Sequence, residues 1–362
     1  MTETIRLATR GSQLALRQAR HVAEILETRR RSTELVEVET TGDAVRDELI
    51  HRLGKTGAFV RSLDEKVLDG DVDAAVHSMK DMPTDFPDGL VVAGVPERAT
   101  SIDVLVTPEG AALGDLPEGA TVGTSSLRRK AQLLASRPDL AVEPLRGNVD
   151  TRVQKLLAPA LRAERERRIE AATEDDEDGD EDEEDADATY DRTPEEWLED
   201  LSELERGALE REPGTEFDAI ALAEAGLVRI GLADTVPYRE LPRPFLSAPG
   251  QGALAVTARD GGLAESLSDA LDHPRSRVET TVERTILGAL GGGCVAPIGI
   301  YAVVQGEHVQ TRVRVLSQDG TEEIEATRDL PIETHPEAAR EFAADLDARG
   351  AGELIRRARR EA

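Results

Sequence analysis

The sequence of 362 residues contains one cysteine, Cys294, and only 2% of its residues are aromatic. A single thiol cannot form a disulfide within the chain, and it cannot build a thiolate metal cluster there either. We therefore expect no metal site built on thiolates, and any role of Cys294 must rest on that thiol alone. In general, a lone cysteine of this kind is either an inert small apolar residue or a reactive group.

An apolar targeting segment is also absent from the N-terminal residues, which read MTETIRL and carry charge from the third position onward. These residues can neither serve as the apolar core of a signal peptide nor span a bilayer. We therefore expect a cytoplasmic protein that makes no contact with a membrane.

Positive charge is scarce, because 44 Lys and Arg residues stand against 73 Asp and Glu residues, for a net charge of -29. Nucleic-acid binding requires clustered cations on the surface, so we expect no nucleic-acid partner. Lysine is especially rare, with five copies against 39 arginines. Such an acidic, lysine-poor composition suits a protein that stays soluble in concentrated salt, where long-range repulsion is screened, and it predicts a halophilic source.

Most of the negative charge lies in one stretch. Residues 174–187 hold twelve carboxylates in fourteen positions, and residues 157–216 carry a net charge of -18. A block of this kind cannot bury enough apolar surface to offset the entropy of ordering. We therefore expect an acidic disordered insertion at about residues 160–214. A short helix is expected to begin after Thr193, since Thr is a good N-cap and Pro194 suits the first helical position.

Elsewhere, short apolar segments alternate with amphipathic ones. Residues 4–9, 13–29 and 35–40 read as strand, helix and strand, and the alternation continues to residue 259. This pattern predicts two α/β lobes with largely parallel sheets. After Asp272 the sequence predicts a helix, two strands and a closing helix at 336–360, which indicates a separate, smaller α+β domain.

Polar and basic residues follow the predicted strands of the lobes. Ligands of open α/β sheets bind at the carboxyl ends of strands, so these loops are the candidate site. The first loop brings Arg6, Arg10 and Ser12, and Ser12 can cap the following helix and leave backbone donors for an anion. A capped helix with solvated arginines is the alternative for this fragment alone.

The second loop, in AVHSMKDMPT, carries Ser78, Lys80 and Asp81 directly after an apolar strand. A carboxylate at this position can hold an N–H group of a ligand and transfer protons. In an isolated fragment, a Lys and an Asp at this spacing more often form an exposed charged pair, which is the alternative for Lys80 and Asp81.

The third loop, in GTSSLRRKAQ, places hydroxyls and two guanidiniums at a junction of strand and helix, a suitable carboxylate receptor. Further arginines follow in LRGNVDTR and AGLVRIG. The candidates in these loops are Thr124, Ser126, Arg128, Arg129, Arg146, Asn148, Arg152 and Arg229. General enrichment in arginine explains each of them singly, but it explains less well why all of them follow strands.

Cys294 lies in GGGCVAPIG, where three glycines allow a sharp bend of the backbone. This setting favours a thiol displayed on a loop over one packed in a core.

Taken together, ATRGSQLALRQA, GKTGAF, AVHSMKDMPT, GTSSLRR, LRGNVDTR, APGQGALAV and GGGCVAPIG resemble the hydroxymethylbilane synthase (porphobilinogen deaminase) family in order and spacing. The resemblance covers nearly the whole chain outside the acidic insertion. It implies two lobes like those of periplasmic binding proteins and a smaller α+β C-terminal domain for cofactor attachment. By this resemblance, residues 1–98 and 248–268 form the first lobe, 103–244 the second and 273–362 the C-terminal domain.

The resemblance also implies a dipyrromethane cofactor attached through Cys294, with Asp81 as the catalytic residue that contacts pyrrole N–H groups. The implied cofactor contacts are Lys55, Ser78, Lys80, Asp81, Thr124, Ser126, Arg128, Arg129, Arg146 and Asn148, and the implied substrate contacts are Arg6, Arg10, Ser12, Arg146, Arg152 and Arg229. Each porphobilinogen carries two carboxylates, so a growing chain of pyrroles requires many guanidinium partners.

The implied reaction joins four porphobilinogens head to tail with loss of ammonia, and water then releases the linear tetrapyrrole. It requires neither a metal nor a nucleotide, and the resemblance implies a monomer. A solute-binding or effector-sensing protein would share the fold and the arginines, so Asp81 and Cys294 separate the two interpretations. A cysteine hydrolase is the third alternative, but no His or acid lies at a convincing spacing from Cys294.

Overall fold

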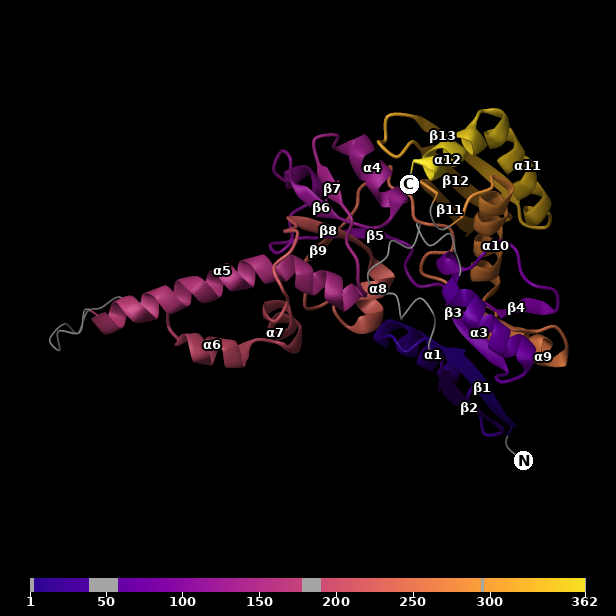
Figure 1. Cartoon of the computed structure of the whole chain (residues 1–362). Coiled ribbons are helices and arrows are strands. Elements are labelled where there is room, and N and C mark those ends of the chain that lie inside the picture. Colours follow the sequence, from indigo (N-terminus) through magenta and orange to yellow (C-terminus); the bar gives the residue numbers. More distant parts are fainter. Residues whose placement is uncertain (1–2, 39–57, 178–189, 294–295, 362) are drawn as a thin grey trace.

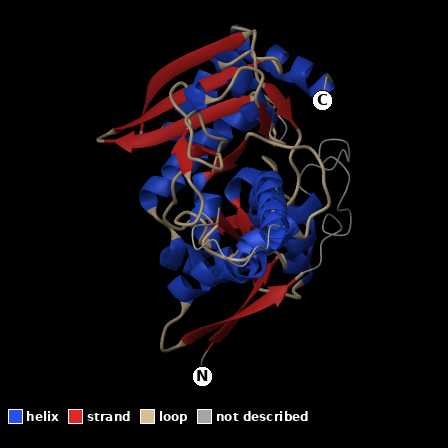
Figure 2. Cartoon of the chain, turned by 90° about the vertical axis from the view of Figure 1, so that its left-hand side faces the viewer, coloured by secondary structure: helices blue, strands red, loops and turns tan. Residues whose placement is uncertain are grey.

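The computed structural model describes residues 3–38, 58–177, 190–293 and 296–361. Three sheets organise this part of the chain. The N-terminus and the C-terminal sheet lie at opposite ends of the molecule (Figures 1 and 2). Two α/β lobes followed by a smaller α+β unit were predicted from the sequence, and this fold class is confirmed.

The first lobe is built on a five-stranded sheet in the order β2-β1-β3-β10-β4. Its strands are β1 (Glu3–Thr9), β2 (Arg31–Glu37), β3 (Ala74–Ser78), β4 (Leu90–Gly94) and β10 (Leu254–Arg259). Helices α1 (Gln13–Leu26), α3 (Ala58–Asp69) and α9 (Gly262–Leu271) cover it. Because successive strand residues face opposite sides, Leu7 packs in the core of α1 and α9 while Ala8 packs in the core of α3.

The second lobe repeats this plan with a sheet in the order β7-β6-β8-β5-β9. Its strands are β5 (Asp103–Val106), β6 (Thr121–Gly123), β7 (Ala141–Glu143), β8 (Ala219–Ala223) and β9 (Tyr238–Glu240). Helices α4 (Leu127–Ser136), α5 (Val149–Glu177) and α8 (Glu224–Ile230) accompany them, together with a short 3-10 turn, η2 (Leu113–Asp115).

The C-terminal unit has an antiparallel sheet of β11 (Ile298–Gln305), β12 (His308–Leu316) and β13 (Glu323–Pro331). It packs against α10 (Pro274–Ala289), α11 (His335–Ala348) and α12 (Ala351–Arg360). β13 was not predicted, since its residues EIEATRDLP are mostly polar and exposed. The single closing helix predicted at 336–360 was wrong, because Gly350 has a φ of 98° and separates two helices.

The prediction of largely parallel sheets is confirmed for four of the five strands in each lobe, and one strand of each sheet runs in the opposite direction. β10 runs antiparallel to both β3 and β4, and β5 runs antiparallel to both β8 and β9. Both reversed strands follow the two segments where the chain crosses between the lobes, at 95–102 and 241–253. After a crossing from the other lobe, the chain can enter the sheet from either side, and the next strand can run in either direction. The order of strands and helices in the sequence therefore does not determine the direction of β5 or β10.

The acidic insertion is only partly what the sequence predicted. α5 continues as one helix through Glu177, and two further helices follow, α6 (Pro194–Asp200) and α7 (Glu203–Leu209). We call α6, α7 and residues 160–177 of α5 the arm, which projects from the second lobe (Figure 1). The prediction that residues 160–214 are disordered is therefore wrong for the arm. Residues 178–189 lie outside the described residues. The helix expected after Thr193 is confirmed, with Thr193 Oγ1 accepting from the Glu196 N–H at 3.2 Å.

One buried carboxylate, that of Glu283 on α10, joins the C-terminal unit to both crossing segments. Arg98 Nη1 and Nη2 donate to its two oxygens at 2.8 and 3.0 Å. Backbone N–H groups of Gly250 and Ala302 donate to the same carboxylate at 2.7 and 3.0 Å. Each crossing segment is thereby tied to α10.

No helix of the described ranges is long and apolar enough to cross a membrane.

Replacing Glu283 by Gln leaves the buried guanidinium of Arg98 without a countercharge. Because loss of one partner of a buried ion pair is strongly destabilising, we expect the free energy of unfolding to fall by about 3–5 kcal/mol. Urea unfolding at fixed salt, followed by circular dichroism, measures this change. Glu353→Gln is the matched control, since Glu353 pairs with Arg356 and Arg360 on the exposed face of α12 and its loss should leave no measurable change. Equal effects of the two substitutions would contradict the assignment.

Candidate active site

The loop after β3 brings a lysine and a carboxylate to the face of the second lobe. Ser78 ends β3, and Lys80 and Asp81 follow on a short 3-10 turn, η1 (Met79–Asp81). Burial lowers the pKa of Lys80, an effect that Asp81 opposes and that Arg129 and Arg152 reinforce. Since both of those arginines belong to the second lobe, the loop lies within electrostatic reach of it.

The loop after β6 shapes the start of α4. The buried Thr124 donates its backbone N–H to Glu143 O at 2.9 Å, and its hydroxyl accepts from the Ser126 N–H at 3.2 Å. Ser126 caps α4 by accepting from the Arg129 N–H at 3.4 Å. This turn places Arg128 and Arg129 in the first helical turn, with both side chains directed inward.

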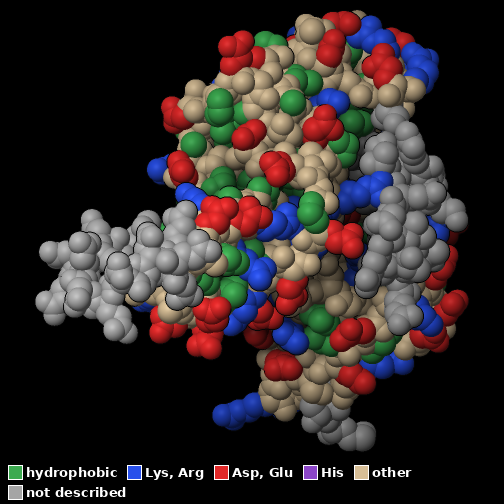
Figure 3. All heavy atoms as spheres, turned by 60° about the vertical axis from the view of Figure 1, so that its left-hand side comes forward, with side chains coloured by type: hydrophobic (Ala, Val, Ile, Leu, Met, Phe, Trp, Pro, Cys, Tyr) green, Lys and Arg blue, Asp and Glu red, His purple; other side chains and the backbone are tan. Residues whose placement is uncertain are grey.

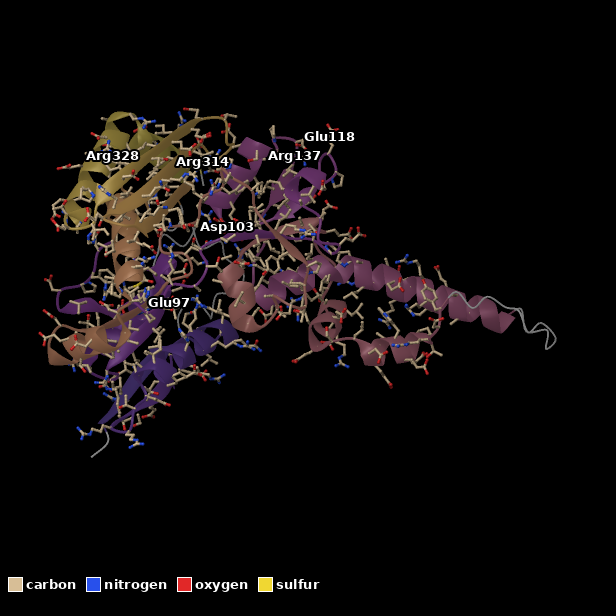
Figure 4. All side chains as sticks on the ribbon, turned by 180° about the vertical axis from the view of Figure 1, so that it is seen from behind. Glu97, Asp103, Glu118, Arg137, Arg314 and Arg328 are labelled. Atoms are coloured by element: carbon tan, nitrogen blue, oxygen red, sulfur yellow. The ribbon has the colours of Figure 1, made fainter. Side chains whose placement is uncertain are left out.

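A single buried carboxylate, that of Asp103, holds both arginines. Arg128 Nη1 donates to Asp103 Oδ2 and, at 2.6 Å, to Leu246 O. Arg129 Nε donates to Asp103 Oδ1 at 2.9 Å. Burial on its own would raise the pKa of Asp103, but the two guanidiniums outweigh it and hold this pKa well below its usual range. Asp103 lies in the interior, where the second lobe faces the rest of the molecule (Figure 4).

The loop before α5 adds further basic groups. Arg152, in the first turns of α5, donates Nε to Gly147 O at 2.8 Å. Burial lowers the pKa of Arg152 to about 10, with Arg129 adding to the effect and Asp81 opposing it. Arg146 Nη1 is buried and has no hydrogen-bond partner among the described residues. The neighbouring Asn148 is exposed.

Three more predicted residues lie on α1 and α8 or beside them. Ser12 caps α1 by accepting from the Ala15 N–H at 3.3 Å, and Arg10 lies partly buried in the loop before it. Arg229 on α8 donates Nη2 to Gly252 O at 2.7 Å, and burial lowers its pKa. Arg17 Nη1 donates to Arg229 O at 3.0 Å, which ties α1 of the first lobe to α8 of the second.

Arg6 does not join this group, which corrects the sequence-based interpretation. Its guanidinium pairs with Asp73 at 3.0 Å and donates to Asp71 O at 2.6 Å. In the register of the sheet, Leu7 is level with Ala74, so Arg6 lies at the start of β3. Ser78, at the other end of that strand, is about 15 Å further along at the usual rise per residue. Arg6 therefore joins β1 to the residues that directly precede β3, at the amino-terminal end of that strand.

The residues that come together carry an excess of positive charge. The group contains four cations, Lys80, Arg128, Arg129 and Arg152, and two carboxylates, Asp81 and Asp103. Basic side chains also gather at the middle of the face shown in Figure 3. Because this group holds more cations than carboxylates, the arrangement suits a ligand that supplies carboxylates.

Two predicted residues, Lys55 and Cys294, lie outside the described residues. Among the ranges that the structure describes, no group of three His, Cys, Asp or Glu side chains is arranged to hold a metal ion.

Sequence analysis missed two residues that organise the site, Asp103 and Gln251. Gln251 Nε2 donates to Asp103 Oδ1 at 3.0 Å and to Ser101 O at 2.6 Å, which joins the two crossing segments. The only signal for Asp103 is a charge at the start of the apolar strand DVLV, and nothing in the sequence pairs it with Arg128, 25 positions away. Gln251 belongs to the motif APGQGALAV, which carried no residue assignment.

Comparison with known families shows to which family the chain belongs. A family model described as the dipyromethane cofactor binding domain of porphobilinogen deaminase matches residues 5–164 and 201–264, and the model of the C-terminal domain of the same enzyme matches 278–348. The chain belongs to the porphobilinogen deaminase family. The predicted family, its enzyme class as a transferase and its dipyrromethane cofactor are thereby confirmed. Residues 165–200, within the arm and the gap beside it, fall outside the match.

Similar curated proteins carry the same family name. A probable porphobilinogen deaminase of Halobacterium salinarum is 52% identical, with all of both chains covered. One of Methanococcoides burtonii is 37% identical over 97% of this chain and 96% of its own. The relative from Halobacterium, a halophilic archaeon, supports the source predicted from composition. A periplasmic substrate-binding protein of an ABC transporter from Coxiella burnetii overlays 74% of this chain and 91% of its own at 12% identity, with a TM-score of 0.35.

The charge state of Asp103 predicts how the stability of the protein depends on pH. Because its pKa is lowered in the folded protein, its stabilising effect is present above the ordinary carboxyl pKa of about 3.9 and is lost as the pH falls below it. We expect Asp103→Asn to lower the free energy of unfolding by an amount that is constant between about pH 5 and 8 and smaller below about pH 4. Urea unfolding across this range measures the difference. A difference that already shrinks above pH 6 would show that the pKa is raised instead.

Proposed function

We propose that this chain condenses four porphobilinogens head to tail, with release of ammonia, and then releases the linear tetrapyrrole hydroxymethylbilane by hydrolysis. The observation that carries the proposal is that Lys80 lies within electrostatic reach of Asp81, Arg129 and Arg152, a group in which cations outnumber carboxylates. Porphobilinogen brings two carboxylates and a pyrrole N–H, which are the groups that this cluster can bind.

The residues present fit a dipyrromethane cofactor. Its carboxylates would offset the excess positive charge, and one of them could accept from the buried Arg146 Nη1. We assign the thioether to Cys294 and the polar contacts to Lys55, Ser78, Lys80, Asp81, Thr124, Ser126, Arg128, Arg129, Arg146 and Asn148. When bound, the group supplies the nucleophilic pyrrole carbon to which each substrate is added.

Asp81 is the proposed catalytic residue. Its carboxylate is exposed on η1, at the end of β3, and lies within electrostatic reach of Lys80 and Arg152. A carboxylate in this position can accept hydrogen bonds from pyrrole N–H groups and stabilise the cation that forms when ammonia leaves. It can also take the proton lost after each new carbon–carbon bond.

Substrate carboxylates are assigned to the remaining basic groups of the site. Arg10, Ser12 and Arg229 lie where α1 meets α8, and Arg146 and Arg152 lie beside α5. Their guanidiniums suit carboxylates because the planar fork can donate two parallel hydrogen bonds. We leave Arg6 out of this set, because Asp73 occupies its guanidinium.

We further propose that the protein is a cytoplasmic monomer without a nucleic-acid partner. The domain boundaries expected from the sequence, 1–98 with 248–268, 103–244 and 273–362, are proposed with it, and each range contains the strands of one sheet.

Replacing Asp81 by Asn keeps the size of the side chain but removes its ability to take a proton. We expect kcat for hydroxymethylbilane formation to fall by about 10²- to 10⁴-fold, in line with loss of general acid–base catalysis. Asp88→Asn is the matched control, since Asp88 is exposed further along the same connection and should keep the wild-type rate. A wild-type rate for Asp81→Asn would remove Asp81 from the mechanism.

The role of Cys294 is tested by the intact mass of the purified protein. We expect wild type from cells supplied with porphobilinogen to exceed the chain mass by two condensed, deaminated porphobilinogens and to give colour with Ehrlich's reagent. Cys294→Ser should show the bare chain mass and no colour. If wild type also shows the bare mass, the synthase proposal fails and a binding protein with the same two lobes takes its place.

A further inference from the structure

A side chain from the C-terminal unit holds the loop that carries Asp81. Arg284 on α10 donates Nη1 to Met79 O at 3.1 Å and to Met82 O at 3.3 Å, and its Nη2 donates to Pro83 O. These carbonyls lie on both sides of Asp81 in the chain. α10 packs in the core of the C-terminal sheet, whereas the loop continues β3 of the first lobe.

The other side of the loop rests on the turn before β10. The buried Met79 donates its backbone N–H to Ala253 O at 3.0 Å. Gly250 has a φ of 73°, and a Cβ at this position would lie 2.6 Å from Met79 Cγ, so only glycine allows the contact. Glu283 accepts from the Gly250 N–H at 2.7 Å. Of two consecutive residues of α10, Arg284 binds the loop directly, and Glu283 binds Gly250 in the turn on which the loop rests.

The chemistry of these contacts requires arginine. A guanidinium presents five N–H donors in a rigid plane, so a single side chain can bind three carbonyls that converge on it. Lysine offers three donors from one point on a flexible stem and cannot span the same set with fixed geometry. Without Arg284, the Met79, Met82 and Pro83 carbonyls lose these bonds. The loop is then held by fewer bonds, among them that from the Met82 N–H to Met79 O at 3.3 Å and that from the Met79 N–H to Ala253 O.

We propose that Arg284 is a positioning residue for Asp81, which fixes the carboxylate by holding the three carbonyls that bracket it. α10 ends at Ala289, five positions before Cys294 in the chain. The helix that leads to the cofactor cysteine thus also sets the place of the acid–base group. This inference rests on the role proposed for Asp81.

The test compares Arg284→Gln with Arg277→Gln in the full-length protein carrying its cofactor. Arg277 is the matched control because it also lies on α10 and also reaches the first lobe, where Nη1 donates to Val92 O at 3.2 Å, but it binds β4 and Asp272 instead of the loop. A misplacement of about 1 Å can reduce a rate by about 100-fold, so we expect kcat of Arg284→Gln to fall by about 10- to 100-fold. KM for porphobilinogen should change little, because the arginines of the site remain.

Arg277→Gln should keep the wild-type kcat even where its melting temperature falls as far as that of Arg284→Gln. Arg284→Lys should recover part of the rate, and it serves as the test variant if Arg284→Gln does not fold. Intact mass establishes that each variant carries its cofactor before rates are compared. Equal losses of kcat in Arg284→Gln and Arg277→Gln, or an unchanged kcat in Arg284→Gln, would overturn the inference.

Failure of the proposed function is a different result. It shows as a wild-type protein that forms no hydroxymethylbilane, whatever the variants do. A wild-type rate for Asp81→Asn, with active wild type, would overturn the role of Asp81 and this inference with it.

Discussion

The arrangement of the molecule depends on the buried carboxylate of Glu283. The chain crosses twice between the lobes, and Arg98 of one crossing and Gly250 of the other both donate to this one side chain. A carboxylate that is fully out of water is stable only when hydrogen bonds and a countercharge replace its hydration. The four donors around Glu283 meet this requirement only while both crossings and the C-terminal unit are in place. Glu283, which lies outside the candidate site, therefore fixes how the two crossing segments and the C-terminal unit are arranged.

Inside the site, the buried carboxylate of Asp103 also holds residues in place, but its charge balance differs from that of Glu283. Glu283 is fully balanced, whereas Asp103 alone faces both Arg128 and Arg129. One carboxylate is enough to orient two guanidiniums, but it leaves positive charge over. Gln251 joins the two clusters, since its backbone carbonyl accepts from Arg98 Nε at 2.9 Å while its side chain donates to Asp103. Gln251 thus connects the crossing segment of Arg98 to the carboxylate that orients Arg128 and Arg129. The positive charge that Asp103 does not balance is available to bind a carboxylate of a ligand.

The sequence grouped Lys80, Asp81 and Arg129 as site candidates because each of them follows a strand. They follow β3 of one sheet and β6 of the other, and the structure brings Lys80 within electrostatic reach of both Asp81 and Arg129. The same reasoning wrongly grouped Arg6 with the site residues. The motif shows that Arg6 belongs to the first strand, but it does not show that Arg6 lies level with the start of β3, where it pairs with Asp73. Asp103 and Glu283 were out of reach because their partners are far away in the chain, 25 and 185 positions for Arg128 and Arg98. Disorder was extended too far along the insertion because charge density was weighed above helix propensity, although residues 160–173 are rich in Ala, Arg and Glu.

The arm carries many acidic residues and projects away from the lobes that hold the site. Most of the net negative charge belongs to residues 157–216, and the part of them that forms the arm projects away from the lobes (Figure 1). The arm is held by local contacts of its own, with Arg168 stacked 4.2 Å from the ring of Tyr190 and 5.3 Å from that of Trp197. At about 1 M salt the Debye length is only about 3 Å, so these exposed carboxylates exert little repulsion on an anionic substrate. The buried cations of the site are screened far less, because salt does not enter the protein interior. A strongly acidic protein can therefore keep a binding site for polycarboxylates.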